Sequence, residues 1–413
     1  GDTVQVAAGT YTEQVVITHA LALRGAGVGL TTVETPGSLP HATGAAEYRA
    51  IICADDAAGP VIIEDLRVDG RATQPATGRF VGIMFNRNGG RVTRAAVQDV
   101  RHTPDDAQTS GIGILASLTE PAAGAAFTLE QVDVVRFQKA GVAVIGRSHM
   151  VALQDVTVAT DGVTSAAIQN GIELVAVVNS RLENCTVTGV THDGVPQPDR
   201  TATGLLAINC TDLAVVASTF EQCLTSLYLE GTSGHLADLM VAQPADEPIA
   251  AHGMISVTGP IEDDLGTLPA PVPTLAGTLR PVTSGLQIYE VAVSDCRFDG
   301  AALAGARGIG LNTFSARAQR LVLLRNKITR WDTGVFVRED TSLFGAVFGR
   351  FSGTLFAENL TWGLDAEAIT AIDARGCQWG DPSGPQHPTI NPDGLGEPVR
   401  GNVLLDPWLT GNL

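Results

Sequence analysis

The sequence predicts an all-β fold, a parallel β-helix in which successive coils of one solenoid stack on each other. A short phrase, a glycine followed by alternating apolar residues, recurs at steps of 29, 30, 30 and 33 residues. It starts at Gly82, Gly111, Gly141, Gly171 and Gly204, and it returns at Gly308 and Gly334. Glycine is frequent, at 46 of 413 residues, and helical periodicity is nearly absent. Short strands and tight turns at a fixed period are typical of a β-solenoid.

A second strand in each repeat ends in a large residue, with a smaller residue two positions earlier. The large residues are Phe137, Val158, Val187, Phe220, Phe298, Ile328 and Trp379, and the smaller ones are Val135, Val156, Cys185, Ser218, Cys296, Asn326 and Cys377. Because one coil cannot bury its inward face alone, we expect each set to stack as a column in the core. Three of the six cysteines are thereby interpreted as buried members of a stack. A disulfide between neighbouring coils is the alternative.

Residues 1–413 are predicted to form a single domain of about ten to twelve coils. From 241 to 284 the repeat gives way to a proline-rich and acidic stretch, which we interpret as one long lateral loop insertion. A shorter excursion at 191–203 interrupts an earlier coil, and residues 377–413 are expected to close the solenoid. Loops of this length inside a compact chain are commonly functional.

Three segments resemble the right-handed parallel β-helix proteins of the pectate-lyase-like superfamily. Residues 1–27 look like opening coils, and Val61–Gly70 (VIIEDLRVDG) is similar to a typical coil. Cys377–Pro385 (CQWGDPSGP) is similar to the closing segment of bacterial extracellular β-helix repeat proteins. The resemblance implies a right-handed helix and a secreted, extracellular or cell-surface protein. It leaves the activity open, because the superfamily includes lyases, hydrolases, esterases, adhesins and phage tailspikes.

The charge of the chain excludes one class of partner. The formal net charge is −18, and no clustered basic surface is visible that could neutralise phosphates, so we expect no nucleic acid. No apolar run reaches the roughly 18 residues of a transmembrane span, and no signal peptide is recognisable. Gly1–Val6 already has the pattern of a strand, so we expect further residues to precede Gly1 in the natural protein.

The alternating register allows a search for catalytic groups on the outward face of the repeat strands. In that register only Glu173 and Glu230 place carboxylates outward, on coils two apart, so their backbones would lie roughly 10 Å from each other. Such a spacing suits an inverting pair of carboxylates, although isolated surface glutamates are the favoured interpretation. Superfamily members that hydrolyse galacturonan carry Asn-Thr-Asp and Arg-Ile-Lys phrases, which this sequence lacks. Paired aspartates such as Asp55-Asp56 are interpreted as turns.

Apolar residues dominate the same outward face. Leu115, Ile145, Val175, Leu206, Ile208 and Phe336 are expected to form a contiguous surface, which the loop 241–284 or another chain must cover. The first functional hypothesis is therefore a structural or interaction protein that presents this face to a protein partner, to a second copy or to a glycan. This hypothesis leans away from an enzyme.

The alternative hypothesis is a polysaccharide lyase or glycoside hydrolase acting on an acidic polysaccharide, in a groove beside loops 191–203 and 241–284. Its candidate catalytic residues are Glu173, Glu230, Tyr228, His192, Asp193, His252 and Arg338. A trimeric phage or secretion-related spike is a third hypothesis. No cofactor is expected, and the alternative to that expectation is Ca²⁺ bound by the hard oxygen ligands of Glu262, Asp263 and Asp264.

Overall fold

The computed structural model is a right-handed parallel β-helix, as the sequence predicts. It describes residues 2–44, 47–73, 79–101, 110–118, 126–146, 150–161, 168–191, 202–243, 252–257, 288–302, 304–313, 318–339 and 346–411. Within these residues every regular element is a strand, and no helix long and apolar enough to cross a bilayer occurs. The calcium ligands considered above, Glu262, Asp263 and Asp264, lie outside the described residues.

The chain divides into two compact units, and each is described by itself. Unit 1 holds the described residues up to Leu206, and unit 2 holds those from Ala207 onward. The residues of β17 (Thr203–Ile208) are shared between the two units. A single domain over 1–413 therefore stays a prediction.

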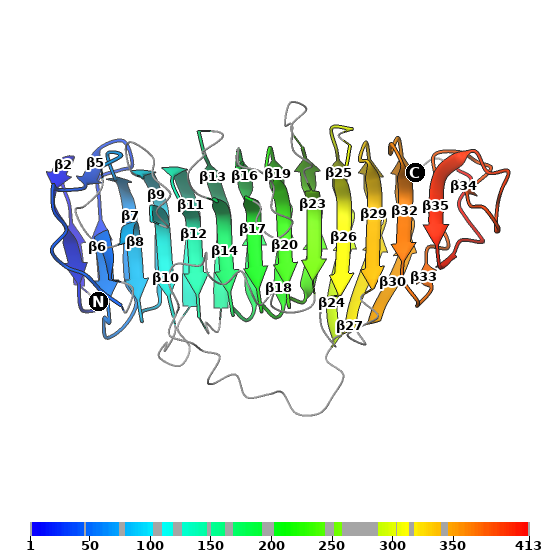
Figure 1. Ribbon diagram of the computed structural model, residues 1–413. Helices are drawn as coiled ribbons and strands as arrows, with labels where there is room; N and C mark the ends of the chain where they lie inside the picture. The colour runs from blue at the N-terminus through cyan, green and yellow to red at the C-terminus, as the bar shows by residue number, and fades with distance from the viewer. Residues whose placement is uncertain are drawn as a thin grey trace. The chain divides into compact units, whose positions relative to one another are not determined.

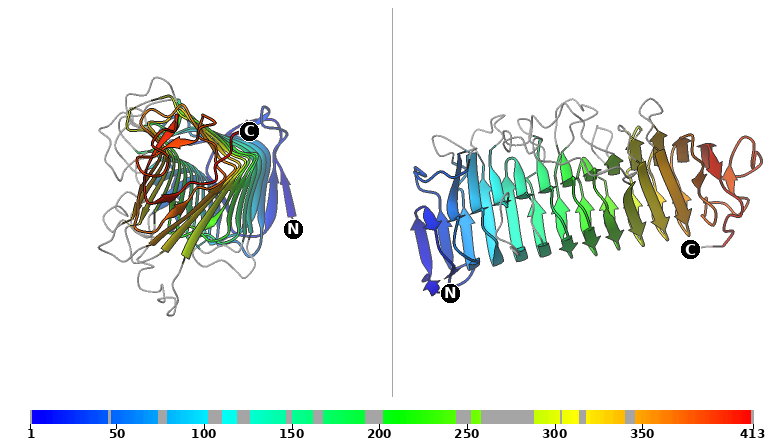
Figure 2. Two further views of the ribbon diagram at one scale, coloured as in Figure 1. Left: turned by 90° about the vertical axis from the view of Figure 1, so that its right-hand side faces the viewer. Right: turned by 90° about the horizontal axis from the view of Figure 1, so that it is seen from below.

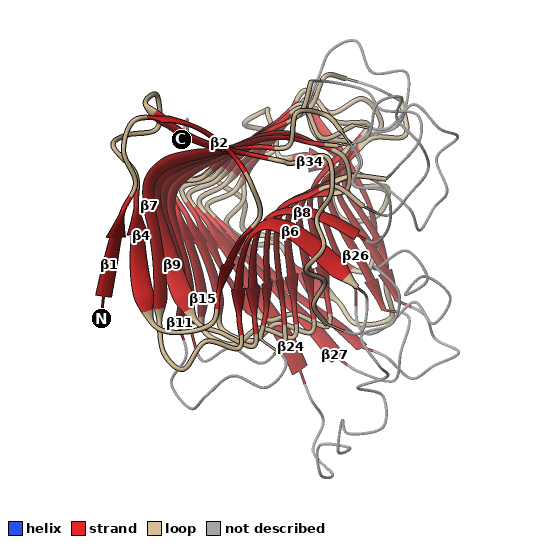
Figure 3. Cartoon of the chain, turned by 90° about the vertical axis from the view of Figure 1, so that its left-hand side faces the viewer, coloured by secondary structure: helices blue, strands red, loops and turns tan. Residues whose placement is uncertain are grey.

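Unit 1 contains strands of two parallel sheets, which lie on different sides of a common interior (Figure 3). Sheet A of unit 1 consists of β1 (Asp2–Gln5), β2 (Gly9–Thr12), β4 (Leu21–Arg24), β5 (Thr31–Glu34), β7 (Val61–Asp69), β9 (Gly90–Val100), β11 (Ala126–Phe137), β13 (Met150–Ala159), β15 (Ser180–Glu183) and β16 (Thr186–Thr188). Sheet B of unit 1 consists of β3 (Val15–Ile17), β6 (Tyr48–Asp55), β8 (Arg79–Asn86), β10 (Ile112–Ser117), β12 (Ala140–Ile145) and β14 (Asn170–Val175).

Unit 2 repeats this arrangement, with its strands stacked in chain order (Figures 1 and 2). Sheet A of unit 2 consists of β18 (Leu213–Val216), β19 (Thr219–Glu221), β21 (Gly234–Ala237), β22 (Met240–Ala242), β24 (Ile288–Ser294), β25 (Arg297–Asp299), β27 (Ala318–Leu324), β28 (Lys327–Thr329), β30 (Ala346–Ser352), β31 (Leu355–Ala357), β33 (Ile372–Asp373) and β36 (Val403–Leu404). Sheet B of unit 2 consists of β20 (Thr225–Glu230), β23 (His252–Val257), β26 (Arg307–Thr313), β29 (Thr333–Glu339), β32 (Trp362–Glu367), β34 (Pro385–Gln386) and β35 (Gly396–Gly401).

Sheet B carries a column of glycines that points into the core. A Cβ added at Gly113 would lie 2.4 Å from Val134 Cγ1, and one at Gly141 would lie 2.4 Å from Val158 Cγ1. Only glycine allows sheet B to approach the side chains of sheet A so closely. This column corrects the expected register at β10 by two residues. Leu115, and not Gly113, pairs with Met84 and Ala143 on the outer face.

The predicted cysteine column is buried in the core. Cys185, Cys296 and Cys377 are each at most 2% exposed, and none of the six cysteines, all of which lie within the described residues, is in a disulfide. Burial raises the pKa of the Cys296 and Cys377 thiols to about 12, so both are protonated. Val135 was assigned wrongly to this column. It is half-buried, because the pairing with β13 places Val132 opposite Val156 and Val134 opposite Val158.

The segment predicted as one long loop, 241–284, is not all loop. Val241 ends within β22, and His252–Val257 forms β23, which pairs with β20 and β26 in sheet B. The sequence missed β23 because acidic and proline-rich residues surround its six-residue apolar phrase. Residues 244–251 and 258–287 lie outside the described residues, as do most of 191–203. In the predicted closing segment 377–413, β35 continues sheet B beside β32.

Sheet A of unit 2 turns a corner in each coil through a residue in the left-handed region. Ala217, Asp238, Asp295 and Arg325 have φ between 49° and 57°. Each donates its backbone N–H to a carbonyl of the following coil, at 3.0–3.1 Å. The Arg325 guanidinium also holds the Asp295 carboxylate through two hydrogen bonds of 2.6 and 2.7 Å. These corners fix the coil geometry and leave sheet B free to carry the functional side chains.

An arginine-rich face on unit 2

The outer face of sheet B in unit 2 carries three rows of side chains, one residue from each strand per row. The pairing aligns Thr225, His252, Arg307, Thr333 and Trp362 in the first row. Tyr228, Ile255, Gly310, Phe336, Asp365 and Arg400 form the second row, and Glu230, Val257, Arg338 and Glu367 belong to the third. Because stacked strands lie about 4.8 Å apart, neighbours within a row are close enough to interact.

Arg307 and Arg338 flank the buried ring of Phe336. The Arg307 guanidinium lies 3.8 Å from the centre of this ring, a cation–π contact that covers its face. Partial burial lowers the pKa of Arg307, and the charges of Asp365 and Glu367 oppose this shift. The group nevertheless stays charged at neutral pH, as arginines in proteins do. Within the described residues neither Arg307 nor Arg338 forms an ion pair, so both guanidiniums can receive an external anion.

Asp365 and Arg400 form an ion pair on this face that is joined by two hydrogen bonds. The guanidinium donates to both carboxylate oxygens, at 2.6 and 2.7 Å, and reaches Glu367 at 3.3 Å. Asp365 is only 3% exposed, whereas the side chain of Glu367 is exposed. Arg400 also lies 4.9 Å from the ring centre of Trp362. Both oxygens of Asp365 are therefore engaged by Arg400.

His252 is a neutral imidazole beside a guanidinium. Its partner in the next strand is Arg307. Burial, and to a smaller extent the positive charge of Arg307, lower the pKa of His252 to about 4. Its Nδ1 atom is buried and forms no hydrogen bond with the described residues. A histidine that is unprotonated and unpartnered at neutral pH has the properties of a general base.

The face brings together four of the predicted catalytic residues and adds others. Tyr228, Glu230, His252 and Arg338 all lie on it, whereas His192 and Asp193 are outside the described residues. The expectation that only Glu173 and Glu230 place carboxylates outward is wrong, because Asp365 and Glu367 occupy the same rows. Their strand continues the glycine repeat as Gly363-Leu364-Asp365-Ala366, 29 residues after Gly334. The sequence analysis missed this repeat because an aspartate occupies its apolar position.

Most of the residues that the sequence predicts to form an apolar outward surface are buried. In unit 1, Leu115 is fully buried and Ile145 is 5% exposed, within a cluster that also contains Cys53 and Met84. Val175 and Leu206 are half-buried. Ile208 and Phe336 are each 7% exposed, and Arg307 covers the Phe336 ring. The chain itself therefore buries most of these residues, and their role as a binding surface stays a prediction.

Glu173 lies in unit 1 and does not belong to the arginine-rich face of unit 2. It is 1% exposed, accepts a hydrogen bond of 3.0 Å from Asn170, and has a second oxygen without a partner among the described residues. Burial lowers the pKa of nearby Lys139, and the charge of Glu173 opposes this shift. Glu173 and Glu230 belong to different units, so their predicted pairing remains untested. A side chain this buried is not positioned to meet a polymer.

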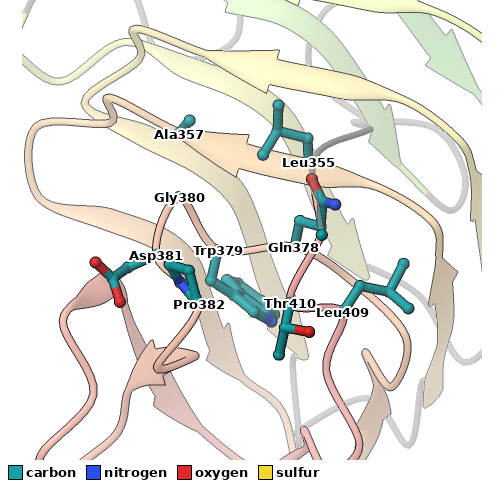
Figure 4. Close-up of a pocket in the computed structure, with 10 residues that line it drawn as sticks. Leu355, Ala357, Gln378, Trp379, Gly380, Asp381, Pro382, Leu409 and Thr410 are labelled. Atoms are coloured by element: carbon teal, nitrogen blue, oxygen red, sulfur yellow. The ribbon is translucent and has the colours of Figure 1, made fainter.

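A small pocket in unit 2 lies at the closing segment (Figure 4). Leu355, Gln378, Trp379, Asp381 and Thr410 are among its lining residues, and its volume is about 260 Å³. The Trp379 ring stacks on Phe356, with centres 4.6 Å apart. This volume lies below the 300–1,000 Å³ typical of ligand pockets, so the pocket suits core packing better than a glycan.

Comparisons with known proteins support the fold and nothing finer. No family model matches the chain, and no curated protein matches it. Among solved structures, the chain is similar to the A-module of a mannuronan C-5 epimerase from Azotobacter vinelandii, with 11% identity over 98% of this chain and 91% of that one, at a TM-score of 0.43.

It is also similar to the catalytic unit of a GH87 α-1,3-glucanase from Streptomyces thermodiastaticus, with 13% identity over 98% of this chain and 63% of that one, at a TM-score of 0.47. A tailspike protein matches with 13% identity over 84% of this chain, at a TM-score of 0.36. The chain spans 61% of the tailspike and 63% of the glucanase unit, which is less than two thirds of each. All three are parallel β-helix proteins, and the strand pairing of this chain shows the same fold.

Proposed function

We propose that the arginine-rich face of unit 2 binds an acidic polysaccharide and cleaves it by β-elimination. The observation that carries this proposal is the pairing of His252, a neutral base, with Arg307, a guanidinium that forms no ion pair with a carboxylate of the described residues. Arg307 and Arg338 would hold the carboxylate of a uronic acid residue, because guanidinium groups match carboxylates in shape and charge. Trp362, half-buried at the end of the first row, offers an apolar wall to the sugar ring.

In this reaction His252 takes the proton from the carbon that bears the uronate carboxyl group. The arginines stabilise the negative charge that develops on that carboxyl group, as preorganised charges do in other enzymes. A carbon–carbon double bond then forms as the glycosidic oxygen leaves with the electron pair of its bond and takes a proton from water. The hydroxide that remains takes the proton from His252, which restores the neutral base. The products are an unsaturated uronyl end and a new free hydroxyl end, so atoms and charges balance.

Hydrolysis by a pair of carboxylates is less consistent with this face. Asp365 and Glu367 are two residues apart on one strand, so their backbones lie roughly 7 Å from each other, close to the spacing of an inverting pair. A glycosidase nevertheless needs one carboxyl group that is protonated and free to donate. Asp365 gives both oxygens to Arg400 and cannot fill that role.

The test uses purified protein with polygalacturonate, alginate and neutral dextran. We expect the ultraviolet absorbance of unsaturated uronyl ends to rise with at least one acidic polymer and not with dextran. H252A should lower the rate by about 100-fold or more while leaving binding in place. R307A should weaken binding by about 10-fold or more, because it removes a charged hydrogen-bonding group.

R320A is the matched control, because Arg320 lies on sheet A and pairs with Glu290 at 3.0 Å. It should leave binding and rate unchanged. Release of reducing ends without unsaturated products would contradict elimination. Equal losses of binding for R307A and R320A would contradict the assignment of this face.

A further inference from the structure

We propose that unit 1 binds a divalent transition metal ion, of the zinc or cobalt class, between His41, Cys53 and Asp55. One potential ligand atom from each residue lies within 4.8 Å of the other two. A thiolate, an imidazole and a carboxylate suit Zn²⁺ and its neighbours in the first transition series, and do not suit Ca²⁺ or Mg²⁺. This site lies on unit 1 and is independent of the function proposed for unit 2.

The backbone already places two of the ligands on one side of a strand. Cys53 and Asp55 are two residues apart at the end of β6, so their side chains share the outer face of sheet B. Cys53 is 1% exposed, and its thiol forms no hydrogen bond with the described residues. The Asp55 side chain is about one fifth exposed and the His41 side chain one third exposed, which leaves a path from solvent.

Hydrogen bonds from neighbouring residues hold the other two ligands in place. Thr43 Oγ1 and Asn86 Nδ2 both donate to Asp55 Oδ1, each at 2.7 Å, which leaves Asp55 Oδ2 facing His41 Nε2 at 2.9 Å. Gln14 donates to the His41 carbonyl at 3.0 Å and accepts from the His41 N–H at 2.9 Å. Such outer contacts are what orient metal ligands in known sites.

Binding requires only small side-chain movements. Ligand atoms around a tetrahedral Zn²⁺ lie about 3.3–3.8 Å from each other, given bonds of 2.0–2.3 Å. The widest spacing, at most 4.8 Å, must therefore contract by about 1 Å, whereas the 2.9 Å between Asp55 Oδ2 and His41 Nε2 must widen by about 0.4 Å. Side-chain rotation of His41 changes both distances. The metal takes the place of the Cys53 thiol proton, which passes to water, and three protein ligands leave a fourth position open.

The sequence contained part of this signal. Asp55-Asp56 was interpreted as a turn, and only Asp56 has that geometry, with φ of 49°. Asp55 is still in the strand, where its spacing of two from Cys53 places both on one face. His41 comes from the preceding loop, 14 residues away, and no sequence period could have assigned it to this position.

The experiment is a titration of tag-free full-length protein with Co²⁺, followed by absorption spectroscopy. We expect one Co²⁺ per chain and a thiolate-to-metal charge-transfer band. C53S should abolish the band, and D55N should weaken binding by about 100-fold. N86A, which removes only a support of Asp55, should weaken it by about 10-fold to 100-fold. C185S is the matched control, because Cys185 is equally buried but lies in the core column, and it should keep the band.

X-ray absorption of the Zn²⁺-loaded wild-type protein provides a readout that does not depend on a folded variant. One sulfur ligand at about 2.3 Å supports the site. A metal shell without sulfur, no stoichiometric binding, or a band that survives in folded C53S would overturn the proposal.

Discussion

His252 shows how one residue takes a functional state from its surroundings. An ordinary histidine titrates near pH 6.5, whereas burial and Arg307 lower the pKa of this one to about 4. A base with a lowered pKa stays unprotonated until the pH falls to that value. Burial, together with its strand neighbour Arg307, therefore keeps His252 unprotonated over a wide range of pH.

This property predicts the acidic limb of the pH profile for the elimination reaction. The value of kcat/KM should stay level from neutral pH downward and fall only as the pH approaches about 4. Stopped-flow or steady-state rates on short substrates across this range would measure it. R307K retains the positive charge and serves as the control, and it should move the limb little. A midpoint near pH 6.5 would mean that His252 is not the base.

Ala217 has an unfavourable backbone conformation at the corner of its coil. Its φ of 49° lies in the left-handed region, which disfavours residues with a Cβ by about 1 kcal/mol, although asparagine tolerates it. Ala217→Asn should therefore raise the free energy of unfolding by about 0.5 kcal/mol. Urea unfolding measures the change. Ala214→Asn, within β18, is the control and should stabilise nothing. Equal effects at both positions would contradict the strain at Ala217.

At the scale of the elements, the glycine column sets how closely sheet B approaches the core. A Cβ at Gly308 would lie 2.5 Å from the carbonyl oxygen of Gly334, a backbone atom that cannot move aside. Gly308→Ala should lower the free energy of unfolding by about 1–3 kcal/mol, as overpacking does. Gly310, two residues on, has no atom nearer than 3.8 Å to the added Cβ, so Gly310→Ala should be nearly neutral. Thermal unfolding of the two variants compares them directly, and similar losses would argue against the column.

The elements also show why the fold could be predicted and the site only in part. Glycine recurrence and alternating apolar residues identified the coils, because every coil solves the same packing problem. Asp365 was missed because a functional strand replaces an apolar residue with a charged one, and so breaks the pattern used to find strands. His252 was singled out only from its dipeptide with Gly253, whereas its alignment with Arg307 follows from strand pairing. The repeat period therefore predicts the fold, whereas candidate site residues such as Asp365 lie where the sequence departs from that period.

At the scale of the whole molecule, ionised carboxylates on the coil corners couple stability to pH. Hydrogen bonds from Arg325 lower the pKa of Asp295, and bonds from Arg330 and Arg297 lower that of Asp299 against the effect of partial burial. The same direction holds for Asp65, which Arg94 binds. Because these folded-state pKa values lie below the ordinary value of about 4, their contribution is present above that pH.

Stability should therefore be level from neutral pH to about pH 5 and should fall as the pH drops through the folded-state values. Urea midpoints at a series of pH values would show this decline. Asp295→Asn removes one such carboxylate, so its curve should run lower at neutral pH and approach that of the wild type in acid. A constant difference between the two curves at every pH would contradict the ionic origin of the effect.

The ion pair between Asp365 and Arg400 has a consequence for the order in which the protein is made. Arg400 lies on β35 and follows Asp365 by 35 positions, so it is synthesised after it. A nascent or prematurely terminated chain that ends before β35 leaves a nearly buried carboxylate without its counter-charge. The arginine-rich face of unit 2 therefore acquires this charge balance only when β35 has joined sheet B.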